Sequence, residues 1–394
     1  MKDPSKYYIS YAFFAFSGGL SNIFVSVLFF SHDSFAQFIY YQLASQTSQI
    51  LFFIVSNYFI KYISARTLFS IGNMLRAIFT GSLLFVPMFS NNGLLFGAII
   101  GSSSGIFWGG NATFSNEISR QTDRYSFLSK NSSISGLFSL IAPTIGGFVI
   151  AYSTAGGILK YYNDFILTFI CLISSSVIAL FIQARGEHGG NFKISNTIIH
   201  ENKYNKFRLY FFSSSVLSLI ITTVIPVYIF YITKNYVITG AFGTVSSSIL
   251  FVSNLMAPRI SRKLHRFVEI AITVIILTSL LYYVRNFQQT FFVFMASSLI
   301  LFFLYPVTNL GMSEFMAYLD RFATSRQFWI NREYYLIIGR VLPLTSVLWI
   351  SEAYNISYVA YLMPIFSLSL LGYIPLLSHR REFKKKRDTK HNRI

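Results

Sequence analysis

Twelve apolar segments, each long enough to cross a lipid bilayer as a helix, dominate this chain of 394 residues. A helix that spans a hydrocarbon layer of roughly 30 Å needs about 20 consecutive apolar residues. Only 12% of the residues are charged and 53% are hydrophobic, whereas soluble proteins carry about 25% charged residues. The sequence therefore predicts an all-α integral membrane protein. We expect its twelve transmembrane helices near residues 7–30, 36–60, 67–88, 93–116, 130–152, 162–183, 207–232, 239–257, 267–284, 290–312, 330–350 and 354–377.

Basic residues fall almost entirely on one side of this predicted topology. The joints on the side that holds the N-terminus carry most of the Lys and Arg residues, whereas the opposite side carries only Lys160, Lys234 and Arg285. Cytoplasmic loops are enriched in Lys and Arg, so we expect both termini to be cytoplasmic. The net charge of +18 then lies at the inner membrane face, where the basic tail 379–394 suits anionic lipids. We expect no nucleic-acid partner, because no aromatic platform accompanies this tail.

Two stretches of the sequence recur at a constant shift of 197 residues. The segment "VSNYFIKYIS" (55–64) matches "VSNLMAPRIS" (252–261), and "EISRQTDRY" (117–125) matches "EFMAYLDRF" (314–322) in its Glu, its Asp-Arg pair and its last aromatic residue. Matches at one shift indicate two homologous six-helix halves in the same membrane orientation. We therefore expect an N-terminal half 1–184, a cytoplasmic linker 185–206, a C-terminal half 207–378 and the basic tail 379–394.

This arrangement of parallel six-helix repeats resembles the major facilitator superfamily over essentially the full length of the chain. More loosely, "GIFWGGN", Glu117 with Arg124, and "NREYYLIIGR" are similar to the bacterial YqgE-type transporters. The resemblance implies that a small-molecule substrate binds near the midplane between the halves, which rock to give alternating access. It also implies the cytoplasmic (inner) membrane of a bacterium, and we expect a monomer.

The fifth expected span contains "APTIGG", which resembles the end of the family's antiporter signature. Its members here are Ala142, Pro143, Gly146 and Gly147, whereas Phe138 stands where the signature has an upstream glycine. Small residues let a helix pack closely on its neighbour, and a proline weakens the backbone so that the helix can bend. We expect Pro143 to take part in gating and the motif to favour export. Simple close packing is the alternative.

The loop between the second and third spans lacks the family's acidic latch, since Ser56 and Ile60 occupy the aligned positions. Glu117 and Glu314, each at a cytoplasmic helix end and followed by an Asp-Arg pair, are candidate replacements. The expected gate pairs them with basic residues among Arg66, Arg124, Arg262 and Arg321. The alternative is that these are ordinary interfacial charges. The fourth span also lacks the Arg of the family's proton-coupled drug exporters, so the resemblance does not imply proton coupling.

Three charged residues within expected spans are candidates for the transport site. Arg76 and Arg340 fall near the middle of the third and eleventh spans, and an intramembrane Arg is unfavourable by at least about 2.5 kcal/mol. We therefore expect each to face a wet cavity or an acidic partner; for Arg76, snorkelling to the cytoplasmic face is the alternative. Glu333 lies seven residues before Arg340 on the same helix face, about 10 Å along the axis. Its carboxylate is a candidate proton-coupling group, and a structural pairing is the alternative.

Uncharged polar residues complete a candidate substrate cavity. Amides recur at helical spacing on the second span, amides on the first and fourth spans could approach them, and one Trp suits stacking on a flat or amphipathic ligand. The set is Asn22, Gln42, Gln46, Gln49, Trp108 and Asn111. Such amides equally bond one helix to another. Prolines in "TTVIPVY" (222–228) and "YPVTN" (305–309) are candidate gating bends.

The sequence contains no motif that indicates enzymatic chemistry. The six His residues lie outside the mid-membrane positions and lack the spacing of paired metal ligands, and no phosphate-binding loop is present. We expect no cofactor and no catalytic residue. The sequence favours a secondary transporter that exports a toxic or secreted amphiphilic compound, such as a drug or peptide-type antibiotic, with protons as coupling ion. Uptake symport of a nutrient and a receptor that does not transport are the alternatives.

Overall fold

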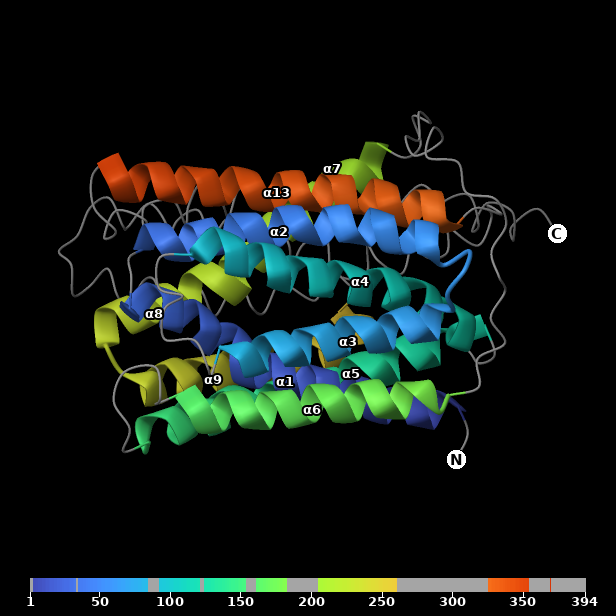
Figure 1. Cartoon of the computed structure of the whole chain (residues 1–394), viewed down its shortest axis with the longest axis horizontal. Helices are drawn as coiled ribbons and strands as arrows, with labels where there is room; N and C mark the ends of the chain where they lie inside the picture. The colour runs from blue at the N-terminus through green and yellow to red at the C-terminus, as the bar shows by residue number, and fades with distance from the viewer. Residues whose placement is uncertain are drawn as a thin grey trace.

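A bundle of long helices makes up the described part of the molecule (Figure 1). The computed structural model describes residues 3–32, 35–83, 92–120, 124–153, 161–182, 205–260, 325–353 and 369. Every element in these ranges is helical. The expected spans at 267–284, 290–312 and, apart from residue 369, 354–377 lie outside the described residues, as do most of the linker and the whole basic tail.

The nine expected spans that the described residues cover are all present as helices. In chain order the elements are α1 (Asp3–His32), α2 (Phe35–Phe59), α3 (Ala65–Ser82), α4 (Gly93–Arg120), α5 (Arg124–Ala151), α6 (Tyr162–Leu180), α7 (Asn205–Leu219), η4 (Ile220–Val224), α8 (Ile225–Thr233), α9 (Tyr236–Ile260) and α13 (Ser325–Ala353).

The expected seventh span at 207–232 is interrupted. It consists of α7, the π-helical turn η4 and α8, whose second residue is Pro226. Proline has no N–H, and its ring clashes with the carbonyl of the preceding turn. A π-helical turn is a known way to widen a helix at such a point. This helix therefore has a defined weak point where the sequence motif suggested a bend.

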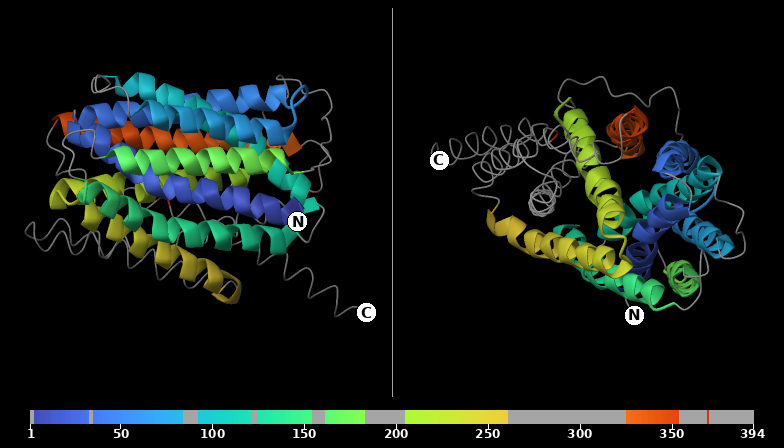
Figure 2. Two further views of the ribbon diagram at one scale, coloured as in Figure 1. Left: turned by 60° about the horizontal axis from the view of Figure 1, so that its bottom comes forward. Right: turned by 90° about the vertical axis from the view of Figure 1, so that its left-hand side faces the viewer.

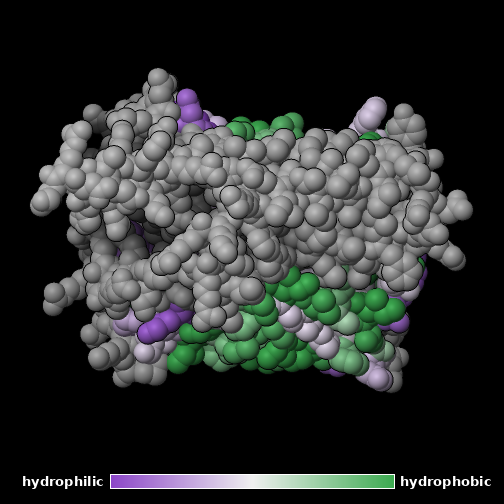
Figure 3. Space-filling view, turned by 180° about the vertical axis from the view of Figure 1, so that it is seen from behind, coloured by the Kyte–Doolittle hydropathy of each residue, from purple (hydrophilic) through white to green (hydrophobic). Residues whose placement is uncertain are grey.

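The outer surface of the bundle matches a lipid environment. Six helical segments of the described part are long and apolar enough to cross a membrane: Pro4–Phe30, Gly93–Ile118, Ser133–Ala151, Tyr162–Leu180, Phe207–Thr233 and Trp329–Ala353. Large apolar side chains such as Leu51, Ile78 and Leu94 are more than half exposed. Figure 3 shows a continuous hydrophobic band over the described part of one face, with hydrophilic residues toward its ends. Exposed apolar area on this scale is expected where lipid, not water, is the solvent.

A row of glycines joins α4 to α2. Glycine occupies every fourth position from 93 to 109 of α4. A Cβ atom at Gly97 would lie 2.1 Å from the carbonyl oxygen of Tyr41, and one at Gly101 would lie 2.2 Å from that of Ser45. Glycines 93 and 105 face the carbonyl oxygens of Gln37 and Gln49 in the same way, and Gly109 faces the side chain of Ser56. Small residues at this spacing bring two helix backbones into direct contact, where Cα–H groups reach carbonyl oxygens.

We expect Gly97→Ala to destabilise the protein strongly, because its new methyl group would meet a backbone oxygen that cannot move without separating α2 from α4. The apparent melting temperature in detergent should fall by at least roughly 5 °C. Gly81→Ala on α3 is the matched control, since its Cβ would meet only the ring edge of Phe169, at 3.3 Å. Equal melting temperatures for the two variants would contradict the role given to the glycine row.

Buried hydroxyl groups fasten α6 to α1 and α3. The Oγ atoms of Ser10 and Ser175 each donate to the other residue's carbonyl oxygen, at 2.7 Å in both directions. Ser70 and Ser176 form the same reciprocal pair at 3.0 and 2.9 Å, and Asn73 Nδ2 donates to Ser175 Oγ at 2.9 Å. Interhelical hydrogen bonds of this kind hold helices together where lipid offers no hydrophobic drive for association.

Two helix pairs carry most of the contact between the N-terminal helices and the later ones: α5 packs on α9, and α2 packs on α13. Adding 197 to the residue numbers of α2 and α5 gives positions within or close to α9 and α13. The two pairs therefore exchange when the sequence repeat is applied, as an approximate two-fold axis along the bundle requires. The end-on view in Figure 2 shows these pairs at two separate places, with α13 beside α2 and α9 beside α5.

Candidate substrate site

Arg76 lies within the bundle on α3, 11 residues or about 16 Å after its first residue. Its guanidinium donates to Oδ1 of Asn22 on α1 and lies 5.5 Å from the ring centre of Phe14. Trp108 of α4 meets the same Phe14 ring edge-on, with centroids 5.9 Å apart. The structure therefore places Arg76, Asn22 and Trp108, three of the expected cavity residues, around one aromatic ring.

The surroundings of Arg76 are polar but uncharged. Among the described residues, no carboxylate forms an ion pair with it; its hydrogen-bond acceptor is a neutral amide. Asn22 is exposed and Arg76 is half-buried although both lie well inside their helices. A polar pair at this depth is unfavourable in contact with hydrocarbon. We therefore infer that the exposed parts of Arg76 and Asn22 face a space inside the bundle and not the lipid. Snorkelling to a helix end is not the arrangement seen.

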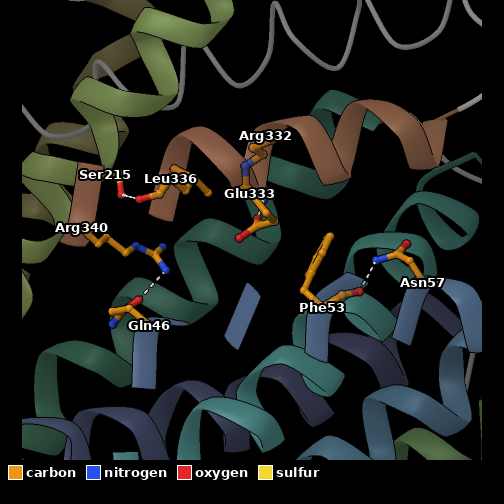
Figure 4. A network of polar contacts seen from close by, with 8 residues as sticks. All are labelled: Gln46, Phe53, Asn57, Ser215, Arg332, Glu333, Leu336 and Arg340. Atoms are coloured by element: carbon orange, nitrogen blue, oxygen red, sulfur yellow. Dashed lines mark hydrogen bonds and ion pairs between the residues drawn. The ribbon is translucent and has the colours of Figure 1, made fainter. Parts of the chain in front are cut away.

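Arg340 connects two parts of the bundle that are far apart in the sequence. It lies halfway along α13, 15 residues after Ser325, and donates from Nη1 to Oε1 of Gln46 on α2 at 2.8 Å (Figure 4). A second bond ties α13 to α7, where Ser215 Oγ donates to the carbonyl oxygen of Leu336. A charge-assisted hydrogen bond between the two expected halves thus lies at mid-helix depth.

A series of side-chain contacts lies between the two arginines. Ser26 Oγ donates to the carbonyl oxygen of Asn22 at 3.0 Å, and Gln42 Nε2 donates to Ser26 Oγ at 3.1 Å. Gln42 and Gln46 are one helical turn apart on α2, so their side chains lie on one face. The polar groups from Arg76 on α3 through α1 and α2 to Arg340 on α13 form one band across the bundle, which we call the arginine band: Asn22, Ser26, Gln42, Gln46, Arg76 and Arg340.

Glu333 has a partner that the helix spacing did not indicate. Its Oε1 accepts a hydrogen bond from Nη1 of the adjacent Arg332 at 3.0 Å, and the Glu333 side chain is almost fully buried. The Arg332 guanidinium also lies 5.2 Å from the ring centre of Trp329. Figure 4 shows this pair apart from Arg340, toward the N-terminal end of α13. The alternative of a structural pairing thus has a concrete partner, while a coupling role for Glu333 remains a prediction.

Asn111 does not lie in the arginine band. Its Oδ1 accepts a hydrogen bond from the hydroxyl of Tyr7 at 2.9 Å, near the beginning of α1 and 15 residues before Asn22. That difference corresponds to about 22 Å along the helix. Gln49, one turn beyond Gln46, presents its backbone oxygen to Gly105 in the glycine row. The Asn111 amide therefore serves a helix contact in the structure, whereas the contact of Gln49 is made by its backbone.

The expected cytoplasmic gate is described only in part. Glu117 is half-buried near the end of α4, and the backbone of Arg124 begins α5. Glu314 and Arg321 lie outside the described residues. Arg66 donates to the carbonyl oxygen of Ile182 just beyond α6. Pairing of these acids with arginines therefore stays a prediction.

Pro143 and Gly147 lie at the contact between α5 and α9, whereas Gly146 faces Phe24 of α1 and Asp164 of α6. A Cβ atom at Gly240 of α9 would lie 2.5 Å from the carbonyl oxygen of Pro143 and 3.3 Å from Cα of Gly147. Thr144 and Thr244 share a hydrogen bond across the same contact. We call this contact the glycine seam: Pro143, Thr144, Gly147, Gly240, Gly243 and Thr244. The close packing expected from "APTIGG" is present, and the neighbour is α9.

Aromatic side chains also join early and late helices at one end of the described bundle. We call it the distal end, because it lies opposite the N-terminus, where α1 ends and α9 begins (Figure 1). Tyr161 donates its hydroxyl to that of Tyr236 at 3.1 Å. Phe30 at the end of α1 packs edge-on against Tyr231, with centroids 6.0 Å apart, and the Lys234 ammonium lies 5.2 Å above the Phe30 ring. Contacts between early and late helices therefore continue to the distal surface.

Two features escaped the reasoning from sequence. The glycine row of α4 was visible as glycine at every fourth position, a known helix-packing signal. Asp164 is fully buried in α6, but an acidic residue in a first helical turn is ordinarily a favourable end group, so nothing in the sequence set it apart. Within the described residues, no three His, Cys, Asp or Glu side chains are grouped to hold a metal ion.

Comparisons with known proteins agree on the fold. A relative from Bacillus subtilis (strain 168), the uncharacterized protein YqgE, is 26% identical over 254 residues, which cover 62% of this chain and 57% of that relative's length. The transporter FucP in the outward conformation matches 96% of this chain and 98% of its own, with 12% identity and a TM-score of 0.65. A bacterial homologue of the iron transporter ferroportin, in an inward-facing state, matches 95% and 97% with 13% identity and a TM-score of 0.65.

A third structure and the family match complete the comparison. The nucleoside transporter NupG matches 95% of this chain and 100% of its own, with 14% identity and a TM-score of 0.65. The sequence pattern described as Major Facilitator Superfamily matches residues 7–328. That range contains most of the chain, including α1 to α9 and the start of α13. The chain therefore belongs to the Major Facilitator Superfamily of membrane transporters.

Proposed function

We propose that this transporter exports a small amphiphilic solute that carries a negatively charged group, in exchange for protons. The observation that carries the proposal is Arg76. A cation deep in the bundle, held by the neutral amide of Asn22 and without an acidic partner among the described residues, offers its charge to a ligand. Supplying the missing anion would relieve the unfavourable position of the guanidinium.

The surroundings of Arg76 suit the apolar part of such a solute. Phe14, Phe107 and Trp108 form a continuous aromatic group, with ring centroids of Phe14 and Phe107 4.0 Å apart and those of Phe107 and Trp108 5.0 Å apart. Small-molecule sites typically combine an apolar wall with a few fixed polar groups. An aromatic wall beside one cation and several amides favours an amphiphile over a sugar, which would need more hydrogen-bonding groups.

The direction of transport is proposed from the contacts between early and late helices at the distal end. If both termini are cytoplasmic, as the distribution of basic residues indicates, the distal end is the outer end. Contact between the halves there suits a state that opens toward the cytoplasm, in which an exporter loads its substrate. The arginine band joins helices of both expected halves, so rocking of the halves would change the site itself.

Sealed membrane vesicles of both orientations test the proposal. A panel of labelled amphiphiles, matched in size and carrying one negative charge, no charge or one positive charge, is supplied with and without an imposed pH gradient. We expect only the anionic members to accumulate in inside-out vesicles, and only when the vesicle interior is acidic. Accumulation in right-side-out vesicles instead would establish uptake. Preference for cationic members would contradict the role of Arg76, and binding without accumulation under any gradient would favour a receptor.

A further inference from the structure

Asp164 is a buried acid that the proposed site does not use. It lies in the first turn of α6, near the distal end, with none of its surface exposed. Neither carboxylate oxygen has a hydrogen-bond partner among the described residues. The hydroxyl of Thr168, one helical turn further on, is also fully buried and without a partner there. Two oxygen-bearing side chains on one face of α6 thus lack the bonds that buried polar groups normally make.

The elements that pack on α6 bring apolar groups to Asp164. A Cβ atom at Gly146 of α5 would lie 2.9 Å from Asp164 Oδ1 and 2.7 Å from the Phe24 ring of α1, so these two residues enclose the carboxyl group. On α3, the last charged residue before the distal end is Arg76, which is bound to Asn22. Phe79 and Leu83 follow it as buried apolar residues.

Three titratable or charged groups near this end are described with other contacts or as exposed. Tyr161 donates to Tyr236, Tyr162 is exposed, and Lys234 lies over the rings of Phe30 and Tyr231. Lys160, four residues before Asp164 in the sequence, lies outside the described residues. The test below therefore includes it.

An ionised carboxylate without hydrogen bonds or a counter-charge is strongly disfavoured in an apolar interior, and such a group binds a proton instead. The neutral acid has one O–H donor and acceptors of modest strength, so its burial between Phe24 and Gly146 is far less unfavourable. Full burial without a partner for either oxygen therefore favours the protonated form of the Asp164 carboxyl group.

The position of Asp164 links it to the glycine seam. Gly146 faces Asp164, and the next residue, Gly147, faces Gly240 of α9 and the carbonyl oxygen of Tyr236. The same Tyr236 accepts the hydrogen bond of Tyr161, which precedes Asp164 by less than one helical turn. Residues 146–147 of α5 and 161–164 at the start of α6 therefore link Asp164 to the contacts between the two expected halves at the distal end.

We propose that Asp164 is a proton-binding site of the transporter, occupied when the distal end is closed and vacated when it opens. When α5 separates from α9, water would enter beside Gly147 and Gly146. This water would reach the carboxyl group of Asp164 and hydrate its ionised form. The O–H bond of Asp164 then breaks, the proton passes to distal water, and the carboxylate keeps the electron pair. Closure reverses this reaction. Because Asp164 exchanges its proton with distal water in both directions, this site sets the pH dependence of distal closure and is separate from the coupling role predicted for Glu333. The inference rests on the proposed function for the two states between which the distal end alternates.

The sign of the pH dependence follows directly. The closed form binds one proton more than the open form at this site, so lowering the pH favours closure and raising it favours opening. Asp164→Asn keeps the size of the side chain and cannot ionise. This variant should therefore stay closed at every pH, whereas Glu333→Gln should keep the pH response of the unaltered protein.

Two measurements on the purified full-length protein, without substrate, test the site. First, infrared difference spectra between the protein and Asp164→Asn are expected to show the carbonyl band of a protonated carboxylic acid at neutral pH, and Glu333→Gln should leave that band in place. Lys160→Gln should leave it unchanged as well. Absence of the band would overturn the proposal. A band that appears only in Lys160→Gln would show that Lys160 holds Asp164 as a carboxylate, and would overturn it too.

Second, spin labels at Tyr152, directly after α5, and at Ile238 on α9, both exposed at the distal end, report closure by their distance distribution. The background is Cys171→Ser, because Cys171 is the single cysteine of the chain. We expect the long-distance fraction to grow with pH and to be constant in Asp164→Asn. The same pH response in that variant would overturn the proposal, and loss of the infrared band on adding Na⁺ at constant pH would assign the site to a metal cation instead. Since no substrate is present, these results stand apart from those of the vesicle panel.

Discussion

Arg76→Gln is expected to weaken binding of the anionic amphiphile that the unaltered protein transports by about 100-fold, which corresponds to about 2.7 kcal/mol. Losing one partner of a desolvated charge pair typically has an effect of about 2–5 kcal/mol. The substitution keeps a polar side chain able to bond Asn22, so the change falls mainly on the ligand. The measurement is the equilibrium dissociation constant of the labelled compound with purified protein in detergent.

Two variants make this result specific. Asn22→Asp places a carboxylate on the Arg76 guanidinium in place of the neutral amide and should reduce binding to a similar extent while Arg76 itself is unchanged. Arg66→Gln removes the same charge from a residue that bonds the carbonyl oxygen beyond α6 and should leave the dissociation constant within about twofold, as expected for a site without shared contacts. Full affinity in both Arg76→Gln and Asn22→Asp would make Arg76 a structural residue.

Gly240→Val should nearly abolish transport while leaving substrate affinity in place. A Cβ atom at this position would lie 2.5 Å from the carbonyl oxygen of Pro143, and forcing extra atoms into a packed contact is unfavourable by about 1–3 kcal/mol. A penalty of about 2 kcal/mol on the closed state alone shifts the balance between closed and open forms by roughly thirtyfold. Turnover falls because each cycle requires this closure.

The matched control for Gly240→Val is Gly136→Ala on α5. Its Cβ would meet only the side chain of Phe251 on α9, at 3.2 Å, and a ring can turn aside where a backbone oxygen cannot. The spin-label pair at Tyr152 and Ile238 should show a separated distal end in Gly240→Val and the original distances in Gly136→Ala. Normal turnover in Gly240→Val would show that closure at the glycine seam is not required for transport.

Much of the fold could be predicted because lipid imposes a simple rule. Each crossing must satisfy its own backbone hydrogen bonds, so long apolar runs become helices whatever their neighbours are. The nine expected spans within the described residues are helices for this reason. The interruption at η4 was less predictable, since a proline bends or breaks a helix in several ways and the surrounding packing selects one of them.

The candidate site was predictable only as a set of residue types. Arg76 with Asn22, and Arg340 with Gln46, come from helices whose relative rotation the sequence does not specify, so the partners emerged only in three dimensions. Gln42 and Asn111 looked equivalent as intramembrane amides, yet one joins the arginine band and the other bonds Tyr7. Asp164 differs from an ordinary helix-end acid only through burial by Phe24 and Gly146, which belong to other helices.

The glycine row of α4 also affects the synthesis of this protein on the ribosome. The face of α2 that receives it is made first, and α4 is complete only 61 residues after Phe59, at Arg120. At about 5–20 residues per second this takes roughly 3–12 s. During that time the backbone oxygens of α2 that face the glycine row lack their partner helix α4. In this state α2 is accessible to quality-control proteases and to non-native contacts with other helices. A substitution in the row would therefore reduce the yield of inserted protein during synthesis, before any finished molecule exists whose stability could be measured.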